Sequence, residues 1–419
     1  MPFAALGLDP ALVCAAMELG FANPTPVQAE AIPAVLRGAD LLASAQTGSG
    51  KTAAFALPLL QLMQLSPADR ATTPRPLRAL VLVPTRELAA QVGDVVRSLG
   101  QHLPRPLKIA VAFGGVSINP QLMGLRGGAD AMVATPGRLL DLVAHNALKL
   151  AAVRLLVLDE ADRLLDLGFA EELEQVLALL PPRRQTLLFS ATFAPAVVAL
   201  ANKLLHDPVR IDIAASAAGA ISEPGIVQRV IQVDAGRRTE LLRHLIKAGG
   251  WERVLVFVAT RYAAQHVAWK LYQTGIFASP FHGDLSQGAR TEVLKQFKDG
   301  QWDVLVTTDL ASRGIDIAQL AVVVNYDLPR SAVQYLHRIG RTGRAGAGGV
   351  AVSFVSADTE AHFRLIEKRQ HLSLPREQIA GFEPITVATP ASPDAAVGTG
   401  GVKGKRPSKK DKLRAEKNA

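Results

Sequence analysis

The chain contains little cysteine, few aromatic residues and no long apolar run. Cys14 is the single cysteine among 419 residues, so neither an internal disulfide nor a cysteine-based zinc cluster can form. We expect Cys14 to be a small, buried helix residue. No apolar run reaches the roughly 18 residues that a membrane span needs, and residues 1–4 lack the basic start of a signal peptide. These absences favour a reducing, cytoplasmic location and no membrane partner.

Positive charge is concentrated at one end of the chain. The net charge is +9, and residues 403–419 hold eight basic and two acidic residues, so the tail carries six of these charges. A nearly balanced body with a basic tail favours a few placed phosphate contacts plus a tether over a uniformly positive surface. The alternative for the tail is a solvated segment that only aids solubility.

Apolar, β-branched runs alternate with helical patterns in both halves of the sequence. Strands are predicted at 40–44, 80–83, 109–113, 131–134, 155–158 and 186–189, and then at 254–258, 277–280, 304–306, 322–326 and 351–355. Helical patterns lie between them, for example at 87–99 and 171–180. This alternation predicts an α/β protein with parallel sheets that are covered on both faces.

Composition places the domain boundaries. Residues 214–225 are rich in Ala, Ser and Gly and end in Pro224-Gly225, which is typical of a flexible linker. The sequence therefore predicts one domain at 1–213 and a second at 226–374, since two domains suit this length. After residue 374 the periodicity fades, and residues 375–419 are predicted to form an extension with a disordered basic tail.

A glycine-rich octapeptide follows the first predicted strand. It reads Ala45-Gln46-Thr47-Gly48-Ser49-Gly50-Lys51-Thr52 and departs from the phosphate-binding pattern G-x-x-x-x-G-K-[ST] only at Ala45. The glycines let backbone N–H groups approach phosphate oxygens, and the next helix presents its positive end. Lys51 would reach the β- and γ-phosphates and Thr52 would bind Mg²⁺. The alternative is a strand-to-helix turn without a ligand.

An acidic tetrad, Asp159-Glu160-Ala161-Asp162, closes the buried run at 155–158. It lies where the carboxyl ends of strands in α/β sheets bind ligands. Asp159 would hold Mg²⁺ through water, and Glu160 would orient or deprotonate the attacking water. A helix-capping acidic cluster is the alternative. The tetrad and the phosphate loop together favour an ATPase.

The chain resembles the DEAD-box RNA helicases, ATPases of superfamily 2, over residues 3–374. The acidic tetrad is the signature of that family, and further motifs occur in the family order. They are Pro24-Thr25-Pro26-Val27-Gln28 with Phe3 seventeen residues before Gly20, Pro84-Thr85-Arg86-Glu87-Leu88, Gly114-Gly115, Thr135-Pro136-Gly137-Arg138, Ser190-Ala191-Thr192, Val256-Phe257-Val258, Phe281-His282-Gly283-Asp284, residues 308–316 and residues 337–344. The resemblance implies two tandem RecA-like domains, ATP and Mg²⁺ as cofactors, and RNA as the partner. Residues 286–291 and 379–384 are most similar to the bacterial RhlE group.

The resemblance assigns the remaining nucleotide contacts. Gln28 and Thr25 belong to an adenine-reading motif that starts near residue 1 and ends at residue 29, and the Gln28 amide can both donate to and accept from adenine. Phe3 would stack on the base. From the residues alone, Gln28 could equally be a surface helix residue and Phe3 a core-capping aromatic. Asp316 would bind the ribose.

Two arginines of the second half, Arg341 and Arg344, are expected to act as arginine fingers. In other NTPases such residues neutralise charge on the γ-phosphate and raise the rate by ~10³–10⁵. Because they lie far in sequence from the phosphate loop, the site would be complete only when the two domains meet. The alternative is that these arginines contact RNA phosphates.

RNA recognition is expected to use the backbone, since only 5% of residues are aromatic, too few for an obvious base-stacking platform. The family positions are Arg86, Gly115, Thr135 and Arg138 in the first half and Arg261, Gly283 and Thr308 in the second. The resemblance also implies that Ser190, Thr192, Asp162 and His337 couple hydrolysis to unwinding. Phosphate and 2′-OH recognition implies little sequence preference and strong salt dependence.

The predicted function is local, nonprocessive, ATP-dependent RNA unwinding or remodelling by a monomer, with ribosomal or RNA-decay proteins as partners. Three alternatives remain open. An ATP-gated RNA clamp shares every motif. A DNA helicase or protein-moving motor is disfavoured by the Gln28 motif and the acidic tetrad. A small-molecule kinase is disfavoured by the second domain with its distant arginines.

Overall fold

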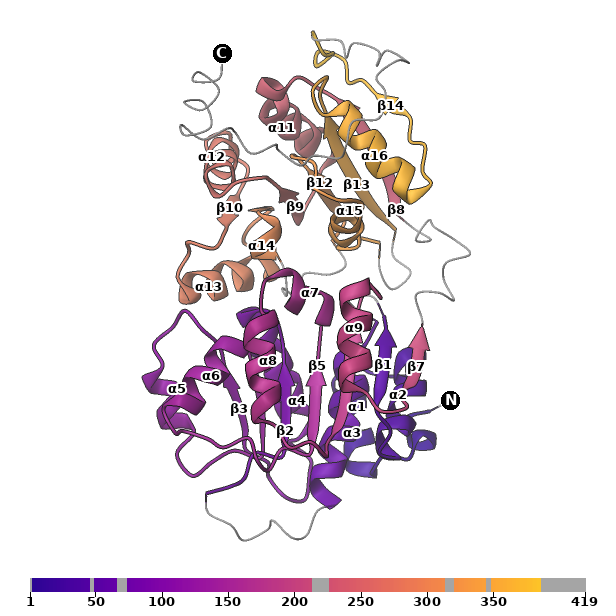
Figure 1. Cartoon of the computed structure of the whole chain (residues 1–419). Coiled ribbons are helices and arrows are strands. Elements are labelled where there is room, and N and C mark those ends of the chain that lie inside the picture. Colours follow the sequence, from indigo (N-terminus) through magenta and orange to yellow (C-terminus); the bar gives the residue numbers. More distant parts are fainter. Residues whose placement is uncertain are drawn as a thin grey trace, which may run out of the picture.

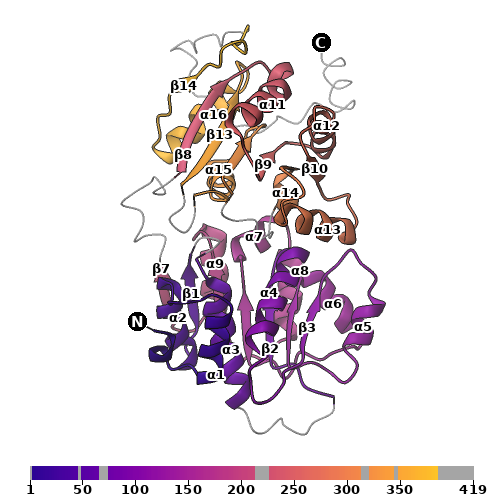
Figure 2. The same ribbon diagram turned by 180° about the vertical axis from the view of Figure 1, so that it is seen from behind.

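The computed structural model describes residues 2–45, 49–65, 74–212, 226–312, 320–343 and 348–385 (Figures 1 and 2). The predicted linker at 214–225 and the predicted disordered tail lie outside the described residues. The described part forms two α/β domains, one stacked on the other, as Figure 1 shows.

Seven parallel strands form the sheet of the first domain. They are β1 (Leu41–Ser44), β2 (Ala79–Leu82), β3 (Ile109–Ala112), β4 (Ala131–Ala134), β5 (Leu155–Leu158), β6 (Gln185–Ser190) and β7 (Val209–Asp212), in the spatial order β3-β4-β2-β5-β6-β1-β7. The helices are η1 (Phe3–Leu6), α1 (Pro10–Glu18), α2 (Pro26–Leu36), α3 (Lys51–Leu65), α4 (Arg86–Leu99), α5 (Asn119–Gly124), α6 (Pro136–Ala144), α7 (Ala161–Asp166), α8 (Ala170–Leu179) and α9 (Pro195–Leu204).

The second domain repeats this architecture. Its strands are β8 (Ile226–Gln232), β9 (Val254–Phe257), β10 (Ala278–Phe281), β11 (Val304–Thr307), β12 (Val322–Asn325), β13 (Gly349–Val355) and β14 (Arg376–Glu377), in the order β10-β11-β9-β12-β13-β8-β14. The helices are η2 (Ala235–Arg237), α11 (Arg238–Gly249), α12 (Arg261–Tyr272), α13 (Gln287–Lys298), α14 (Asp309–Ser312), α15 (Ala332–Ile339) and α16 (Glu360–Gln370). Strand for strand, the two orders correspond, which confirms the predicted pair of tandem parallel sheets.

Burial on both faces explains the apolar runs of the strands. In β5, Leu155 and Val157 pack with residues of α2, α3 and α4, whereas Leu156 and Leu158 pack with residues of α6, α8 and α9. Successive side chains of a strand point to opposite faces, so a strand covered on both sides needs an unbroken apolar run. The arrowheads of β1, β5 and β7 in Figure 1 point toward the second domain, so the carboxyl ends of these strands face that domain.

Three strands, β7, β8 and β14, were not predicted, and the last of them corrects a boundary. β14 pairs with β8, so the second sheet extends beyond residue 374, where the sequence predicted its end. Glu377 forms an ion pair with Arg229 at 2.6 Å, and Ile379 and Phe382 pack against the core of the second domain. Residues 375–385 therefore belong to the second domain.

The prediction for Cys14 was also wrong. Cys14 is exposed on α1, while Leu12, Ala15 and Ala16 of the same helix are buried. Position 14 thus falls on the solvent face of this helix. Among the described residues, no helix is long and apolar enough to cross a membrane.

Candidate active site and nucleic-acid interface

The phosphate loop begins directly after β1 and ends in α3. Gln46, Thr47 and Gly48 lie outside the described residues, but Ala45, Ser49 and Gly50 frame them. Gly50 has a φ of 89°, and a Cβ on it would lie 2.4 Å from Nε2 of Gln28. Both the left-handed backbone and the close approach of Gln28 require glycine here.

Lys51 begins α3 and carries the clearest sign of a ligand. The residue is 6% exposed, and its Nζ has no hydrogen-bond partner among the described residues. A buried ammonium without a partner is costly, whereas an anion would compensate it. Thr52 follows on the same helix with a half-buried side chain. The residues of this loop therefore fit a bound phosphate chain.

Asp159 and Glu160 are buried at the carboxyl end of β5. Glu160 adopts a left-handed backbone (φ 51°, ψ 51°) at the start of α7, and its N–H donates to Oδ1 of Asp159 at 2.9 Å. Burial raises the pKa of Asp159 to about 6, with the Lys51 charge opposing the shift and the Glu160 charge adding to it. Closely spaced carboxylates near Lys51 and Thr52 suit a hard divalent cation, which prefers oxygen ligands.

Glu160 is held ionised by neighbouring cations. Burial alone would raise its pKa, but the charges of Arg163, Lys51 and Arg341 hold the pKa below its ordinary value. Arg163 donates to Oε2 of Glu160 at 2.9 Å, and both side chains are buried. Arg341, which comes from the second domain, thus lies close enough to act on a carboxylate of the first.

Gln28 is fully buried and connects α2 to the phosphate loop. Its Oε1 accepts from the N–H of Thr25 at 2.9 Å, and its Nε2 donates to the carbonyl of Gly50 at 3.0 Å. Phe3 is 2% exposed within the core of the first domain. Its position matches the core-capping alternative, and its ring has no free face in this conformation. Adenine recognition by Gln28, Thr25 and Phe3 stays a prediction.

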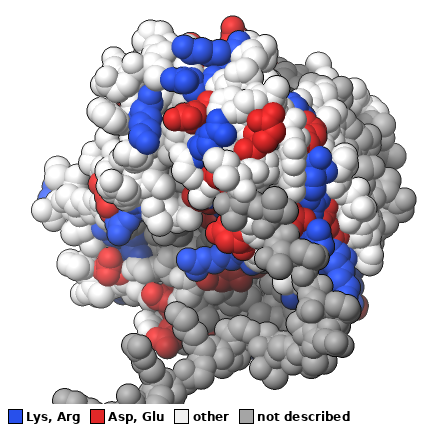
Figure 3. All heavy atoms as spheres, turned by 90° about the horizontal axis from the view of Figure 1, so that it is seen from above, with Lys and Arg blue, Asp and Glu red and all other residues white. Residues whose placement is uncertain are grey.

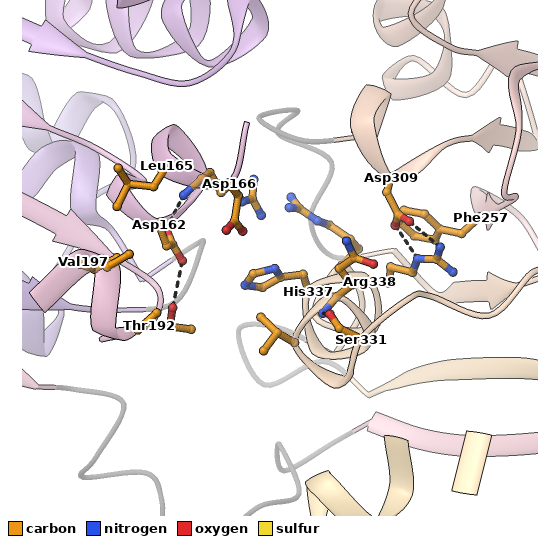
Figure 4. Close-up of a pocket in the computed structure, with 16 residues that line it drawn as sticks. Asp162, Leu165, Asp166, Thr192, Val197, Phe257, Asp309, Ser331, His337 and Arg338 are labelled. Atoms are coloured by element: carbon orange, nitrogen blue, oxygen red, sulfur yellow. Dashed lines mark hydrogen bonds and ion pairs between the residues drawn. The ribbon is translucent and has the colours of Figure 1, made fainter. Parts of the chain in front are cut away.

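The predicted coupling residues meet at the cleft between the domains. Oγ of Ser190 donates to the carbonyl of Thr192 at 2.7 Å, and Oγ1 of Thr192 donates to Oδ2 of Asp162 at 3.4 Å. Asp162, Thr192 and His337 line a cavity of about 280 Å³, and Ser190 is connected to it through its hydrogen bond to Thr192. Figure 4 shows Asp162 and Thr192 on one side of the cavity and His337 opposite them on α15. Burial raises the pKa of Asp162.

Arg341 lines the same cavity, just beyond α15. Arg344 and Asp316, the other residues predicted to reach the nucleotide from this side, lie outside the described residues. Of the groups that were predicted to share one site, Glu160 and Arg341 lie on opposite domains, and the charge of Arg341 helps to hold the pKa of Glu160 below its ordinary value.

A larger pocket of about 590 Å³ lies between the domains on another side. It contains five of the seven residues that were predicted to bind RNA: Arg86, Gly115, Thr135, Arg138 and Gly283. A Cβ on Gly115 would lie 2.0 Å from the guanidinium of Arg86, so this glycine lets the Arg86 side chain lie across the backbone. Because α4, α6 and the loop after β10 contribute side by side, the pocket depends on both domains.

The other two predicted RNA residues, Arg261 and Thr308, are not in this pocket. Arg261 begins α12 and forms an ion pair with Asp284, the neighbour of Gly283. Thr308 is buried after β11. Over the end of the molecule seen in Figure 3, Lys and Arg are interspersed with Asp and Glu, which agrees with a nearly balanced body.

Several residues of these sites were not singled out from the sequence. Arg163 pairs with Glu160, as described above. Arg338 forms two bonds with Asp309, at 2.6 and 2.7 Å, and its guanidinium lies 4.8 Å from the centre of the Phe257 ring. Arg290 bridges the domains through Glu87 at 2.7 Å. The only sequence signal was that each lies in or near a motif.

Comparisons with known proteins show which family this chain resembles over both domains. A family model described as DEAD/DEAH box helicase matches residues 25–200, and one described as helicase conserved C-terminal domain matches residues 237–346. The ATP-dependent RNA helicase DeaD of Mycobacterium tuberculosis is 40% identical over 383 residues, which cover 91% of this chain and 66% of that protein. The chain therefore spans just under two thirds of that relative.

Two further proteins are similar over more of their own length. The ATP-dependent rRNA helicase RRP3 of Gibberella zeae is 39% identical over 387 residues, covering 91% of this chain and 77% of that protein. The structure of S. cerevisiae Dbp5 bound to RNA and ADP BeF3 has a TM-score of 0.76 and 32% identity, covering 90% of this chain and 95% of that chain.

Proposed function

Because this chain belongs to the DEAD-box family of ATP-dependent RNA helicases, we propose that it couples ATP binding and hydrolysis to local, nonprocessive unwinding or remodelling of RNA duplexes and RNA–protein complexes. One observation carries the proposal. Five predicted RNA contacts, drawn from both domains, line one pocket, and the charge of Arg341 in the second domain lowers the pKa of Glu160 in the first. Both sites therefore need the domains to be together, which links nucleotide binding to RNA binding.

In the proposed site, Lys51 binds the β- and γ-phosphates through its buried ammonium, and residues 46–50 complete the phosphate loop. Glu160, kept ionised by Arg163 and Lys51, orients or deprotonates the attacking water. Arg341, together with Arg344, neutralises charge that develops on the γ-phosphate. Thr52 and Asp159 would hold Mg²⁺, which when bound neutralises phosphate charge. Gln28, Thr25, Phe3 and Asp316 are the proposed adenosine contacts.

Unwinding follows from the difference between two domain arrangements. When the domains close on ATP, the pocket with Arg86, Thr135 and Arg138 on one wall and Gly283 on the other is complete. If this pocket fits a bent single strand better than a duplex, closure opens a few base pairs by differential affinity. Hydrolysis then reopens the cleft, and Ser190, Thr192, Asp162 and His337 transmit the change.

We extend the proposal to properties that the sequence suggested. We propose that the two domains comprise residues 1–213 and 226–385 with a linker between them, and that the chain belongs to the RhlE group, on the pattern of residues 286–291 and 379–384. We propose a cytoplasmic monomer that binds RNA through its backbone, with Arg261 and Thr308 as further contacts. We also propose ribosomal or RNA-decay proteins as partners, and the name of one relative, an rRNA helicase, supports the ribosomal choice.

Steady-state ATP hydrolysis tests the proposal directly. The rate is measured without nucleic acid, with structured RNA and with matched DNA, using Glu160→Gln as the inactive control. Stimulation by RNA alone is the expected result. Equal stimulation by DNA, or a high rate without any nucleic acid, would show that RNA is not the specific substrate. A strand-separation assay then distinguishes an unwinding enzyme from an ATP-gated clamp.

A further inference from the structure

The exposed aromatic residues of this protein are concentrated on one helix. Among the described residues, every aromatic side chain that is largely exposed lies between positions 262 and 277, namely Tyr262, Trp269, Tyr272 and Phe277. Tyr262 is 75% exposed and Trp269 is 57% exposed. The chain has only four tyrosines and three tryptophans, so this concentration is far from an even distribution. An exposed aromatic cluster of this kind marks an interaction surface.

Helical spacing aligns three of these rings. Tyr262, His266 and Trp269 stand at i, i+4 and i+7 of α12, which places them on one face. The Tyr262 and His266 rings are 5.7 Å apart with planes at 11°, and the His266 and Trp269 rings are 6.4 Å apart with planes at 24°. The rings of such a row are already ordered, so binding a planar partner costs the protein little side-chain entropy. We refer to these three residues as the aromatic row.

The aromatic row begins beside the proposed RNA pocket. Arg261, the residue before Tyr262, forms an ion pair with Asp284, and Gln265 contacts His282 at 3.0 Å. These two partners flank Gly283, which lines the pocket. Figures 1 and 2 both show α12 beside β10, the strand that leads into the loop with Gly283. A strand that leaves the pocket past Gly283 therefore meets α12.

The charge of α12 favours a nucleic acid over a protein partner. The helix contains Arg261 and Lys270 but no carboxylate. Aromatic faces combined with basic side chains are what single-stranded nucleic acids require, because every base can stack and every nucleotide carries a phosphate.

We propose that the aromatic row is a stacking platform for the bases of single-stranded RNA that leaves the pocket. This inference rests on the proposed function. It adds base contacts outside the pocket to the backbone contacts inside it, and it departs from the expectation that the chain has too few aromatic residues for an obvious platform. The aromatic residues are few, but the fold collects them.

The test compares a short RNA that only fills the pocket with the same RNA extended by about four nucleotides at either end. Binding to the full-length protein is measured by fluorescence anisotropy with ADP–beryllium fluoride present. For wild-type protein, the extension at one end should tighten binding by about tenfold. The double substitution Tyr262→Ala/Trp269→Ala should abolish this gain while leaving the affinity for the short RNA unchanged. Tyr262→Phe/Trp269→Phe, which keeps the rings, should retain it.

Two controls isolate stacking. An extension of abasic nucleotides keeps the phosphates but lacks the bases. Its effect on the affinity of wild-type protein should be as small as the effect of the normal extension on the double alanine variant. Leu365→Ala, which truncates an equally exposed apolar residue on α16 of the same domain, should have no effect.

The outcomes separate this inference from the proposed function. A gain that survives in the double alanine variant, or that abasic nucleotides reproduce, would overturn the platform. The platform would also be overturned if wild-type protein binds the short RNA but gains no affinity from the extension. The aromatic row would then be assigned to a protein partner. Failure of RNA to bind the pocket or to stimulate hydrolysis would instead refute the proposed function.

Discussion

Lys51 presents a buried ammonium that the described part of the protein leaves without a hydrogen-bond partner. We predict that Lys51→Met, which keeps the aliphatic length, weakens ATP binding by about tenfold to a hundredfold, since a hydrogen bond to a charged group contributes ~1.5–3 kcal/mol. Titration with a fluorescent ATP analogue measures the loss. Lys203→Met, which removes an exposed lysine of the same domain, is the control. Unchanged affinity in Lys51→Met would remove Lys51 from the phosphate site.

Arg163 is predicted to matter for stability as much as for chemistry. Arg163→Ala would leave Glu160 buried without its nearest cation, and breaking a buried ion pair by removing one partner costs ~3–5 kcal/mol. We expect the unfolding temperature of the first domain to fall accordingly in calorimetry.

The chain offers a matched control for Arg163. Arg97 and Asp94 have the same i,i+3 spacing and the same 2.9 Å separation as Arg163 and Glu160, but they are exposed. Arg97→Ala should therefore cost only about 0.2–1 kcal/mol. Equal losses in the two variants would show that burial of the Glu160 pair contributes nothing.

Lys51 and Arg163 show what the sequence could and could not predict about the site. Lys51 follows from the phosphate loop, because its role depends on local spacing alone. The pairing of Arg163 with Glu160 depends on the left-handed backbone of Glu160, and that of Arg290 with Glu87 depends on two domains meeting. Phe3 shows the converse, since spacing suggested a ligand contact and tertiary packing buried the ring.

Among the secondary-structure elements, β14 extends the second domain beyond its predicted end. Arg376 donates to Glu360 at 2.9 Å and to Glu367 at 2.7 Å, both on α16. We predict that a chain ending at residue 374 loses stability in its second domain, whereas a chain ending at residue 385 does not. Arg376→Ala alone should cost about 1.5–3 kcal/mol. Urea unfolding followed by Trp fluorescence measures both effects.

The strands that the sequence missed share a physical reason. β7 alternates apolar and polar residues over only four positions at the edge of its sheet, and β14 has two residues. β8 is longer, but its half-buried polar residues Gln228 and Arg229 interrupt the apolar run. The central strands, buried on both faces, are continuous apolar runs and were predicted within one or two residues of their observed ends.

For the molecule as a whole, the basic tail is predicted to concentrate RNA near the cleft. Deleting residues 386–419 removes most of the net positive charge, so it should weaken RNA binding and flatten its dependence on salt. The hydrolysis rate at saturating RNA should stay nearly the same, because the sites in the cleft are intact. An unchanged Kd for RNA at low salt would leave solubility as the role of the tail.

The ion pair between Glu87 on α4 and Arg290 on α13 joins the two domains, and each of these side chains is about one-tenth exposed. Arg290 also donates to the carbonyls of His282 and Ala311 and lies over the Phe281 ring, so its position does not depend on Glu87. We predict that Glu87→Gln preserves both domains but weakens closure by about 1–2 kcal/mol, a factor of 5–30. Apparent RNA affinity in the presence of ATP should fall by that factor.

Closure and RNA binding both depend on the ion pair between Glu87 and Arg290, whereas ATP binding to the first domain alone does not. Affinity for ATP without RNA should therefore be unchanged in Glu87→Gln. Asp94→Asn, on the same helix but in an exposed ion pair, is the control and should change neither affinity. A distance label in each domain reports closure directly. Equal closure by wild type and Glu87→Gln with ATP and RNA would show that other interactions between the domains are sufficient.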